Sequence, residues 1–299
     1  MGLLVVGTGA LACLFAARLA GSGSEVTMLG SWQEGLTALH QRGVRLLDMN
    51  GSSHHHPVKV TDDTDNRGKF RQALVLVKSW QTERVAKQLE RRLTSTGIVL
   101  TLQNGFGNYE TLIGRLGQGR VALGVTTVGA KMLEPGYVQH TGEGKVMIGC
   151  HPKLGGLAEL LINAGFHVEM ISDPESLLWG KLVINAAINP LTALLRVPNG
   201  ELLSRPTARE LMSEAAREAA LVATRKGIKL PYANPVNAVE DVARNTAANT
   251  SSMLQDVLRG TPTEIDAING AIVQEGEMLG VPTPVNRMLW RLVKGLDHN

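Results

Sequence analysis

Residues 3–12 read LLVVGTGALA, a short apolar run followed by a glycine-rich turn. The apolar run has the pattern of a strand that is buried on both faces of a parallel sheet. In the turn, Gly7 permits a tight bend, Gly9 lets a pyrophosphate approach the backbone, and Ala12 lets the following helix pack closely. We therefore predict that this turn binds a dinucleotide through Gly7, Thr8, Gly9, Ala10, Leu11 and Ala12.

The segment that follows favours this interpretation over a purely structural glycine-rich turn. A helix is expected over about residues 10–20, with its free N–H groups facing the phosphates. A second strand is expected over residues 25–29, and it runs into Gly30 and Ser31, with no acid before Glu34. Proteins that bind NAD usually place Asp or Glu here to hold the ribose. The neutral Ser31 therefore favours NADP as the cofactor.

Two further buried strands, residues 73–77 and 98–102, each lead to a polar residue. Lys78 and Asn104 follow these strands at their carboxyl ends, which is the edge where open α/β sheets bind ligands. The simpler alternatives are a lysine that leaves its strand for water and an Asn104-Gly105 pair that forms only a turn. Residues 137–140 and 145–149 are predicted to pair as an antiparallel hairpin around Gly142.

Residues 41–60 have a weaker pattern. Residues 44–47 and 58–60 are expected to be strands on either side of a turn at Asn50-Gly51. The run His54-His55-His56 suggests a metal site, but three consecutive side chains cannot all point to one centre from a strand. No nearby spacing of Cys, Asp or Glu completes such a site. We therefore predict a solvated loop here and no metal.

Residues 179–202 read WGKLVINAAINPLTALLRVPNGEL. On a helix, Lys181, Asn185 and Asn189 would lie above one another on one face, while the rest of the segment is apolar enough for a buried helix. Buried polar groups without partners would cost about 1–3 kcal/mol each. Something polar must therefore face this ladder, either backbone carbonyls at a domain interface or a ligand.

The last third of the chain shows helical periodicity without strand patterns. Helices are expected over residues 210–226, 236–257, 264–278 and 285–296. Thr261-Pro262-Thr263-Glu264 matches a capping box, which would give Glu264 a structural role. We predict an α/β fold with an N-terminal Rossmann-type dinucleotide-binding domain, residues 1–172, and an all-helical C-terminal domain, residues 173–299.

The composition excludes several classes of protein. A length of 299 residues suits two domains. A net charge of +3 without a run of Lys or Arg argues against nucleic acid as a partner. Cys13 and Cys150 lack metal-like spacing, which is typical of a reduced cytoplasmic protein.

The sequence shows neither a signal peptide nor an uninterrupted apolar run of about 18–20 residues, so we expect no association with a membrane. A homodimer is expected only because symmetric dimers are the most frequent oligomers of soluble proteins.

Residues 179–202, together with the turn at residues 7–12 and the stretch Lys78-Ser79-Trp80-Gln81, resemble the ketopantoate reductases (2-dehydropantoate 2-reductases). The resemblance implies an NADP-dependent oxidoreductase that converts 2-dehydropantoate to pantoate in pantothenate and coenzyme A biosynthesis. It also implies that Lys181 is the general acid and that Glu264 acts in the site. A partly buried lysine suits this role, because loss of solvation lowers its pKa towards the working pH.

The resemblance assigns the remaining residues to ligands. It places the NADP phosphate region at Lys78, the cofactor at Ala130 and Glu264, and both nicotinamide and substrate at Asn104. The substrate, a small 2-oxo acid, would be held by Asn104, Lys181, Asn185, Asn189, Asn199, Asn249 and Ser252. Members of the family often carry arginine at about the position of Ser31, so this chain departs from the pattern there. The alternatives are a related NAD(P)H-dependent reductase of another small 2-oxo acid and a non-catalytic dinucleotide-binding sensor.

Overall fold

The computed structural model describes residues 2–62 and 69–296. The chain forms two compact units. The first comprises residues 1–103 and 108–174, and the second comprises residues 104–107 and 175–299. A four-residue segment in the first half of the chain, Asn104–Gly107, thus belongs with the helices of the second half, which the sequence did not predict.

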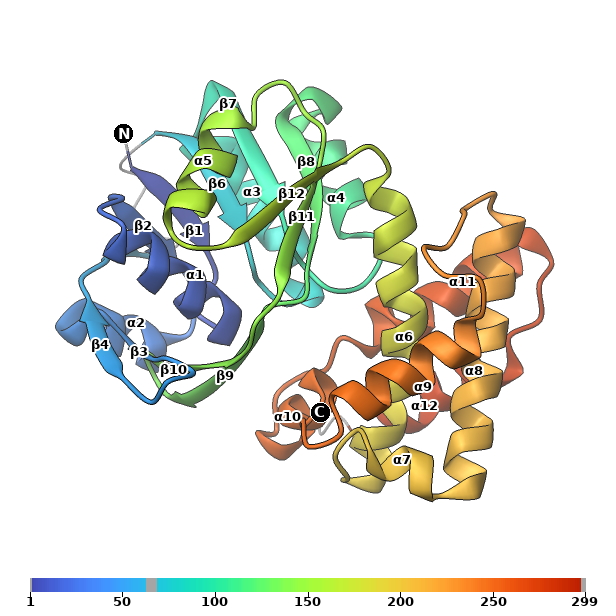
Figure 1. The fold of residues 1–299 in the computed structure, drawn as a ribbon. Helices are drawn as coiled ribbons and strands as arrows, with labels where there is room; N and C mark the ends of the chain where they lie inside the picture. The colour runs from blue at the N-terminus through green and yellow to red at the C-terminus, as the bar shows by residue number, and fades with distance from the viewer. Residues whose placement is uncertain (1, 63–68, 297–299) are drawn as a thin grey trace. The chain divides into compact units, whose positions relative to one another are not determined.

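The first unit is built on an eight-stranded sheet (Figure 1). Its order is β12-β11-β8-β7-β6-β1-β2-β5, and all neighbours are parallel except β8 and β11. The strands are β1 (Leu3–Val6), β2 (Val26–Leu29), β5 (Lys59–Thr61), β6 (Phe70–Val75), β7 (Leu93–Thr101), β8 (Val121–Thr126), β11 (Lys145–Gly149) and β12 (His167–Ile171). Counted along the chain, the six strands from β5 to β8 have the order 3-2-1-4-5-6 of a Rossmann sheet. The predicted fold class is confirmed.

Helices cover both faces of this sheet. Leu3 and Val5 of β1 pack in one core cluster with residues of α1 and α5, whereas Leu4 and Val6 pack in a second cluster with residues of α3 and α4. This alternation explains why β1 is apolar at every position. The helices of the unit are α1 (Ala10–Gly21), α2 (Gln33–Arg42), α3 (Thr82–Arg92), α4 (Asn108–Leu116) and α5 (Gly155–Asn163), with short 3-10 turns η1 (Ser79–Gln81) and η2 (Gln118–Arg120).

A smaller sheet lies beside α1 and has the order β4-β3-β10-β9 (Figure 1). Its strands are β3 (Val44–Leu47), β4 (Ser53–His56), β9 (Gly129–Glu134) and β10 (Tyr137–Gly142). The loop predicted at His54-His55-His56 is wrong, because these residues form β4 and pair antiparallel with β3. His54 and His55 are exposed and His56 is partly buried, and three polar residues in a row give no hydrophobic alternation from which a strand could be recognised. Residues 59–61 instead join the large sheet beside β2.

The predicted hairpin of residues 137–140 and 145–149 is also wrong. The strand β10 pairs antiparallel with β9, and β11 pairs antiparallel with β8 in the other sheet. The hairpin turn is Pro135-Gly136, where Gly136 has a φ of 75°. This left-handed conformation favours glycine, so the Pro-Gly pair was the better turn signal.

The second unit is helical beyond Pro174. Its elements are α6 (Pro174–Leu195), α7 (Glu201–Ser204), α8 (Pro206–Arg225), α9 (Pro235–Asn245), α10 (Ser252–Leu258), η3 (Ile265–Ala267), α11 (Asn269–Leu279) and α12 (Pro284–Lys294). The continuous helix predicted over residues 236–257 is wrong, because the helix stops at Asn245 and a new one begins at Ser252. Asn234 caps α9 and Ser251 caps α10 through their side chains, as is typical of these residue types.

The helix α6 passes through the core of this unit. By length and composition alone it could cross a membrane, but 72% of its most apolar stretch is buried inside the protein. Trp179, Leu182, Val183 and Ala186 are among its buried residues. A helix that is apolar nearly all round and buried in this way is typical of a core helix.

Candidate active site

The glycine-rich turn joins β1 to α1 in the first unit. Gly7 has a φ of 131°, and a Cβ there would lie 3.1 Å from both Ala12 Cβ and Leu76 O. Gly7 is therefore required both by its backbone conformation and by the approach of the chain after β6. The strands β1 and β6 are neighbours on either side of the point where strand order reverses, where open α/β sheets bind ligands.

Gly9 has a different environment. Its φ is −79°, which any residue adopts, and a Cβ there would meet no atom of the described residues within 4 Å apart from its immediate chain neighbours and its own helix backbone. The protein itself therefore does not require glycine at this position, whereas a closely bound ligand would. Gly9 caps α1 without a side-chain hydrogen bond, and the first turn of α1 carries no acid. These uncapped N–H groups suit a phosphate, so the turn fits a dinucleotide.

The remaining residues of the turn have structural contacts as well. Thr8 is buried, and its Cγ2 would lie 2.5 Å from a Cβ at Gly30, at the end of β2. Ala10 and Leu11 pack against the same core cluster as Ala130. Ala130 lies in β9 of the smaller sheet, in register with His140.

Two residues separate the end of β2 from the cap of α2. Ser31 is exposed, and Trp32 caps α2 through its backbone without a side-chain hydrogen bond. Lys78 caps η1 in the same way, after the end of β6, and is only partly exposed. A positive charge thus lies at the carboxyl edge of the sheet, two strands from β2.

The predicted polar ladder lies on α6 in the second unit. Lys181 and Asn185 are partly buried, and Asn189 is buried with 6% of its surface exposed. Burial lowers the pKa of Lys181 to about 8, although the negative charge of Glu264 acts in the opposite direction. A lysine with this pKa exchanges its proton near neutral pH, as a general acid must.

Glu264 is not part of a capping box, so this prediction is wrong. The 3-10 turn η3 begins only at Ile265, and Glu264 makes no side-chain capping bond to it. The Thr261 hydroxyl instead donates to Asp256 O. Glu264 has 4% of its surface exposed and acts on the pKa of Lys181. Because no helix begins at Pro262, Glu264 does not serve as the third residue of a capping box.

Asn199 and Asn249 are joined through the backbone, because Asn199 N donates to Asn249 O over 3.0 Å. The Asn199 side chain is buried and donates to Thr246 Oγ1 over 2.9 Å. Its Oδ1 has no hydrogen-bond partner among the described residues, so Asn199 offers an acceptor. The Asn249 side chain is exposed.

Ser252 is the first residue of α10 and is partly buried. The preceding Ser251 fixes this helix end, because it caps α10 and its hydroxyl bonds to Thr192 Oγ1 of α6 over 2.7 Å. Neither Ser251 nor Thr192 is among the residues predicted from the sequence. A serine before a short apolar helix is an N-cap signal that would have identified Ser251.

The predicted site residues fall into two groups. The first unit contains the residues of the glycine-rich turn together with Ser31, Lys78 and Ala130. The second unit contains the three ladder residues of α6 together with Asn199, Asn249, Ser252 and Glu264. Asn104 joins the second group. The second unit also contains a buried polar residue that was not predicted as a site residue, Thr263. It has 6% of its surface exposed, and its hydroxyl has no hydrogen-bond partner among the described residues.

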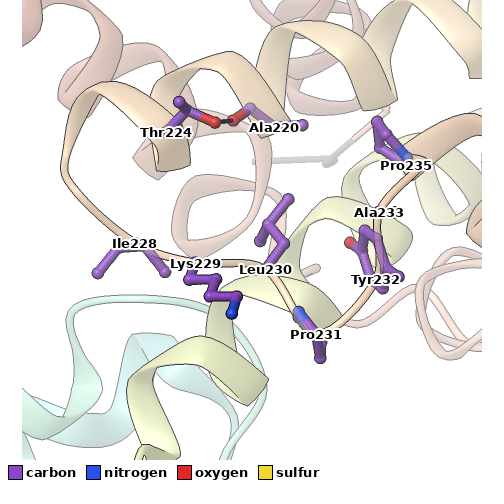
Figure 2. Close-up of a pocket in the computed structure, with 9 residues that line it drawn as sticks. All are labelled: Ala220, Thr224, Ile228, Lys229, Leu230, Pro231, Tyr232, Ala233 and Pro235. Carbon is purple, nitrogen blue, oxygen red and sulfur yellow. Dashed lines mark hydrogen bonds between the residues drawn. The ribbon is translucent and has the colours of Figure 1, made fainter.

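A groove of about 560 Å³ in the second unit carries none of these residues (Figure 2). It lies between α8 and the loop that follows, and Leu230, Pro231 and Tyr232 form part of its mainly apolar wall. Tyr232 Oη donates to Gly180 O over 2.9 Å, and Pro231 leaves no room for a Cβ at Gly180. The groove wall thus supports the turn of α6 next to Lys181.

Known proteins resemble the chain along its whole length. Residues 3–153 match the family described as "Ketopantoate reductase PanE/ApbA", and residues 173–297 match "Ketopantoate reductase PanE/ApbA C terminal". A 2-dehydropantoate 2-reductase of Archaeoglobus fulgidus is 38% identical over 98% of this chain and 97% of the relative.

Two solved structures have the same fold. A PanE/ApbA family ketopantoate reductase from Ralstonia eutropha JMP134 has a TM-score of 0.92 and 33% identity, covering 99% of this chain and 98% of that one. A ternary structure of D-mandelate dehydrogenase with NADH and anilino(oxo)acetate has a TM-score of 0.93 and 25% identity, with the same coverage. The chain therefore belongs to the ketopantoate reductase family.

Proposed function

We propose that this protein is a 2-dehydropantoate 2-reductase, which reduces 2-dehydropantoate to pantoate with NADPH in pantothenate and coenzyme A biosynthesis. The relatives that match along its length carry this name. The observation that carries the proposal is Lys181: a partly buried lysine with a pKa lowered to about 8, on a helix face that also presents Asn185 and Asn189.

We propose that residues 1–172 bind the cofactor and residues 173–299 carry the substrate site. The uncapped end of α1, the free space at Gly9 and the charge of Lys78 support phosphate binding by the first domain. Lys78 would also compensate for the neutral Ser31 and so favour NADP over NAD. Asn104, Ala130 and Glu264 complete the proposed cofactor contacts.

Bound NADPH supplies a hydride to the ketone carbon of the substrate. The protein must hold the ketone and provide a proton. Lys181 donates that proton to the ketone oxygen as its C=O bond becomes a C–O single bond, and solvent then reprotonates the amine. Before the transfer, the ammonium stabilises the negative charge that develops on the oxygen.

The neutral side chains fix the substrate without adding charge. Asn104, Asn185 and Asn189 can donate to its carboxylate, whereas the unpaired Oδ1 of Asn199 accepts from its hydroxyl. Asn249 and Ser252 supply further polar contacts. Glu264 holds Lys181 in its protonated form, as its effect on the lysine pKa indicates.

A second candidate is the reduction of another small 2-oxo acid. It is favoured by the likeness to D-mandelate dehydrogenase, a structure that contains NADH and anilino(oxo)acetate. The polar ladder suits a carboxylate next to a ketone, which both kinds of substrate share. The surrounding apolar wall would decide between them.

The experiment is the initial rate of loss of reduced-nicotinamide absorbance with ketopantoate or a panel of other 2-oxo acids, each with NADPH or NADH. Fast oxidation of NADPH with ketopantoate is expected. Equal rates with NADH would contradict the NADP preference. Turnover of other 2-oxo acids without ketopantoate turnover would favour the second candidate, and no turnover of any would favour a non-catalytic binding protein.

We also propose that the protein works in the cytoplasm, away from membranes, as a homodimer. The burial of α6 inside the helical unit supports a place away from membranes, and the two cysteines without metal-like spacing favour the reducing cytoplasm. The general frequency of symmetric dimers supports the homodimer. Light scattering coupled to gel filtration would test the oligomeric state.

A further inference from the structure

The segment Asn104–Gly107 has the sequence NGFG and is held by the helical unit. Phe106 N donates to Ala267 O over 2.8 Å. Gly105 has a φ of 82°, and a Cβ there would lie 2.7 Å from Ala267 Cβ and 2.8 Å from Ala267 O. The backbone of this segment therefore lies directly against η3, at a distance that only glycine at position 105 permits.

Phe106 supplies the only apolar side chain of the segment. Its ring packs against the ring of Trp179 with 5.3 Å between centroids and an interplanar angle of 53°, a favourable tilted arrangement. Lys226 Nζ lies 5.5 Å from the centroid of the Phe106 ring. Glu275 pairs with Lys226 over 2.7 Å, which keeps the cation near the ring.

These neighbours belong to the elements that carry the proposed site. Trp179 precedes Lys181 by two residues on α6, and Ala267 follows Glu264 by three residues. Asn104 precedes Phe106 by two residues. Trp179 is fully buried, and its Nε1 has no hydrogen-bond partner among the described residues, so packing alone holds its ring. Phe106 thus joins its own segment to α6 and to η3 with its cap Glu264, and each of these three segments carries at least one proposed site residue.

We propose that Phe106 is a positioning residue, whose ring and backbone amide fix Asn104 relative to Lys181 and Glu264. The inference rests on the proposed function. Neither glycine of the NGFG segment can anchor it through a side chain. Loss of the Phe106 ring would remove the packing against Trp179 that helps to place Asn104, and a displacement of about 1 Å at a site residue can cost on the order of 10²-fold in rate.

The test compares Phe106→Ala, Phe106→Tyr and Phe70→Ala with the wild type. Phe70 is the matched control, because it is also partly buried but packs in a core cluster of the first unit, at the start of β6. The readouts are kcat, the KM for ketopantoate, the dissociation constant for NADPH and the fraction of folded protein. Phe106→Tyr keeps the ring that contacts Trp179 and Lys226.

Phe106→Ala is expected to lower kcat by about 10–100-fold and to raise the KM for ketopantoate. NADPH affinity should fall by a smaller factor than kcat, because the phosphates bind to the other unit and only the nicotinamide end of the cofactor would meet Asn104. Phe106→Tyr and Phe70→Ala should stay within about threefold of the wild type in both parameters.

The inference is overturned if Phe106→Ala leaves kcat and KM unchanged. It is equally overturned if turnover falls only in proportion to the loss of folded protein, with an unchanged KM, as for a purely structural residue. The wild-type rate with ketopantoate separately tests the proposed function. If the wild type reduces only another 2-oxo acid, the proposed substrate is wrong, and the same variant ratios measured with that acid still decide the role of Phe106.

Discussion

Lys181 combines a cationic side chain with a partly buried position on an apolar helix. Burial disfavours the charged form and lowers the pKa to about 8, and Glu264 limits this shift. A lysine in water, with a pKa of 10.5, would hold its proton too tightly for efficient transfer near neutral pH. The surroundings of Lys181 therefore determine its reactivity more than its residue type does.

Two measurements on Lys181 follow. Lys181→Ala should lower kcat by about 10²–10⁴-fold, the usual contribution of a general acid, without loss of NADPH binding.

For the wild type, kcat should be constant below about pH 8 and fall as the pH rises through that value, because the neutral amine has no proton to donate. Near-wild-type turnover of Lys181→Ala, or a kcat that is flat up to pH 10, would remove Lys181 from the mechanism.

At the scale of elements, α6 continues through Pro190 although proline lacks the N–H that would bond to Ala186 O. Asn269 Nδ2 donates to Ala186 O over 3.0 Å and so replaces the missing donor. It also donates to Asn286 Oδ1, and Asn286 in turn donates to Ala215 O and Glu218. A buried network from three other helices thus stabilises the part of α6 that carries Asn189.

Asn269→Ala should therefore lower the free energy of opening of α6 by about 1–3 kcal/mol, because Ala186 O loses its donor in a buried place. Native-state hydrogen exchange of the α6 amides measures this quantity. In a Pro190→Ala background the helix regains its own N–H, so the same substitution should cost less. Equal costs in the two backgrounds would show that Asn269 does not compensate for Pro190.

At the scale of the whole molecule, the two units have separate cores. The core clusters around β1 lie entirely within the first unit, and the cluster that contains Trp179 lies in the second. A ligand that binds mainly through the turn after β1 should therefore stabilise the two units unequally.

Hydrogen exchange with and without NADPH tests this expectation. At about 100 times its dissociation constant, NADPH should add up to about 2.7 kcal/mol of protection in β1, α1 and β6, and much less in α8 and α12. NADH at the same free concentration should protect less, given the proposed NADP preference. Equal protection of both units would contradict the assignment of the cofactor to the first domain.

The sequence was most informative where structure is locally determined. The strand, turn and helix of residues 3–21 follow from apolar runs and glycine positions, and the ladder on α6 follows from helical spacing. Pairings between distant segments were not accessible, because β9 and β11 find partners that local patterns do not specify. The capping-box prediction at Glu264 failed for a local reason, because no helix begins at Pro262 and the Thr261 hydroxyl donates to Asp256 O at the end of the preceding helix. Phe106 gives no signal until its neighbours from other segments are known.

The course of the chain limits how such a protein can be divided or recombined. Residues 104–107 belong to the helical unit, yet segments of the first unit flank them on both sides. A chimera that exchanged residues 1–172 for those of another dinucleotide-binding protein would bring a foreign loop to the place of Asn104 and Phe106. The two halves of the chain are therefore not independent modules. Residues of this loop and residues of the helices that contact it must be exchanged together.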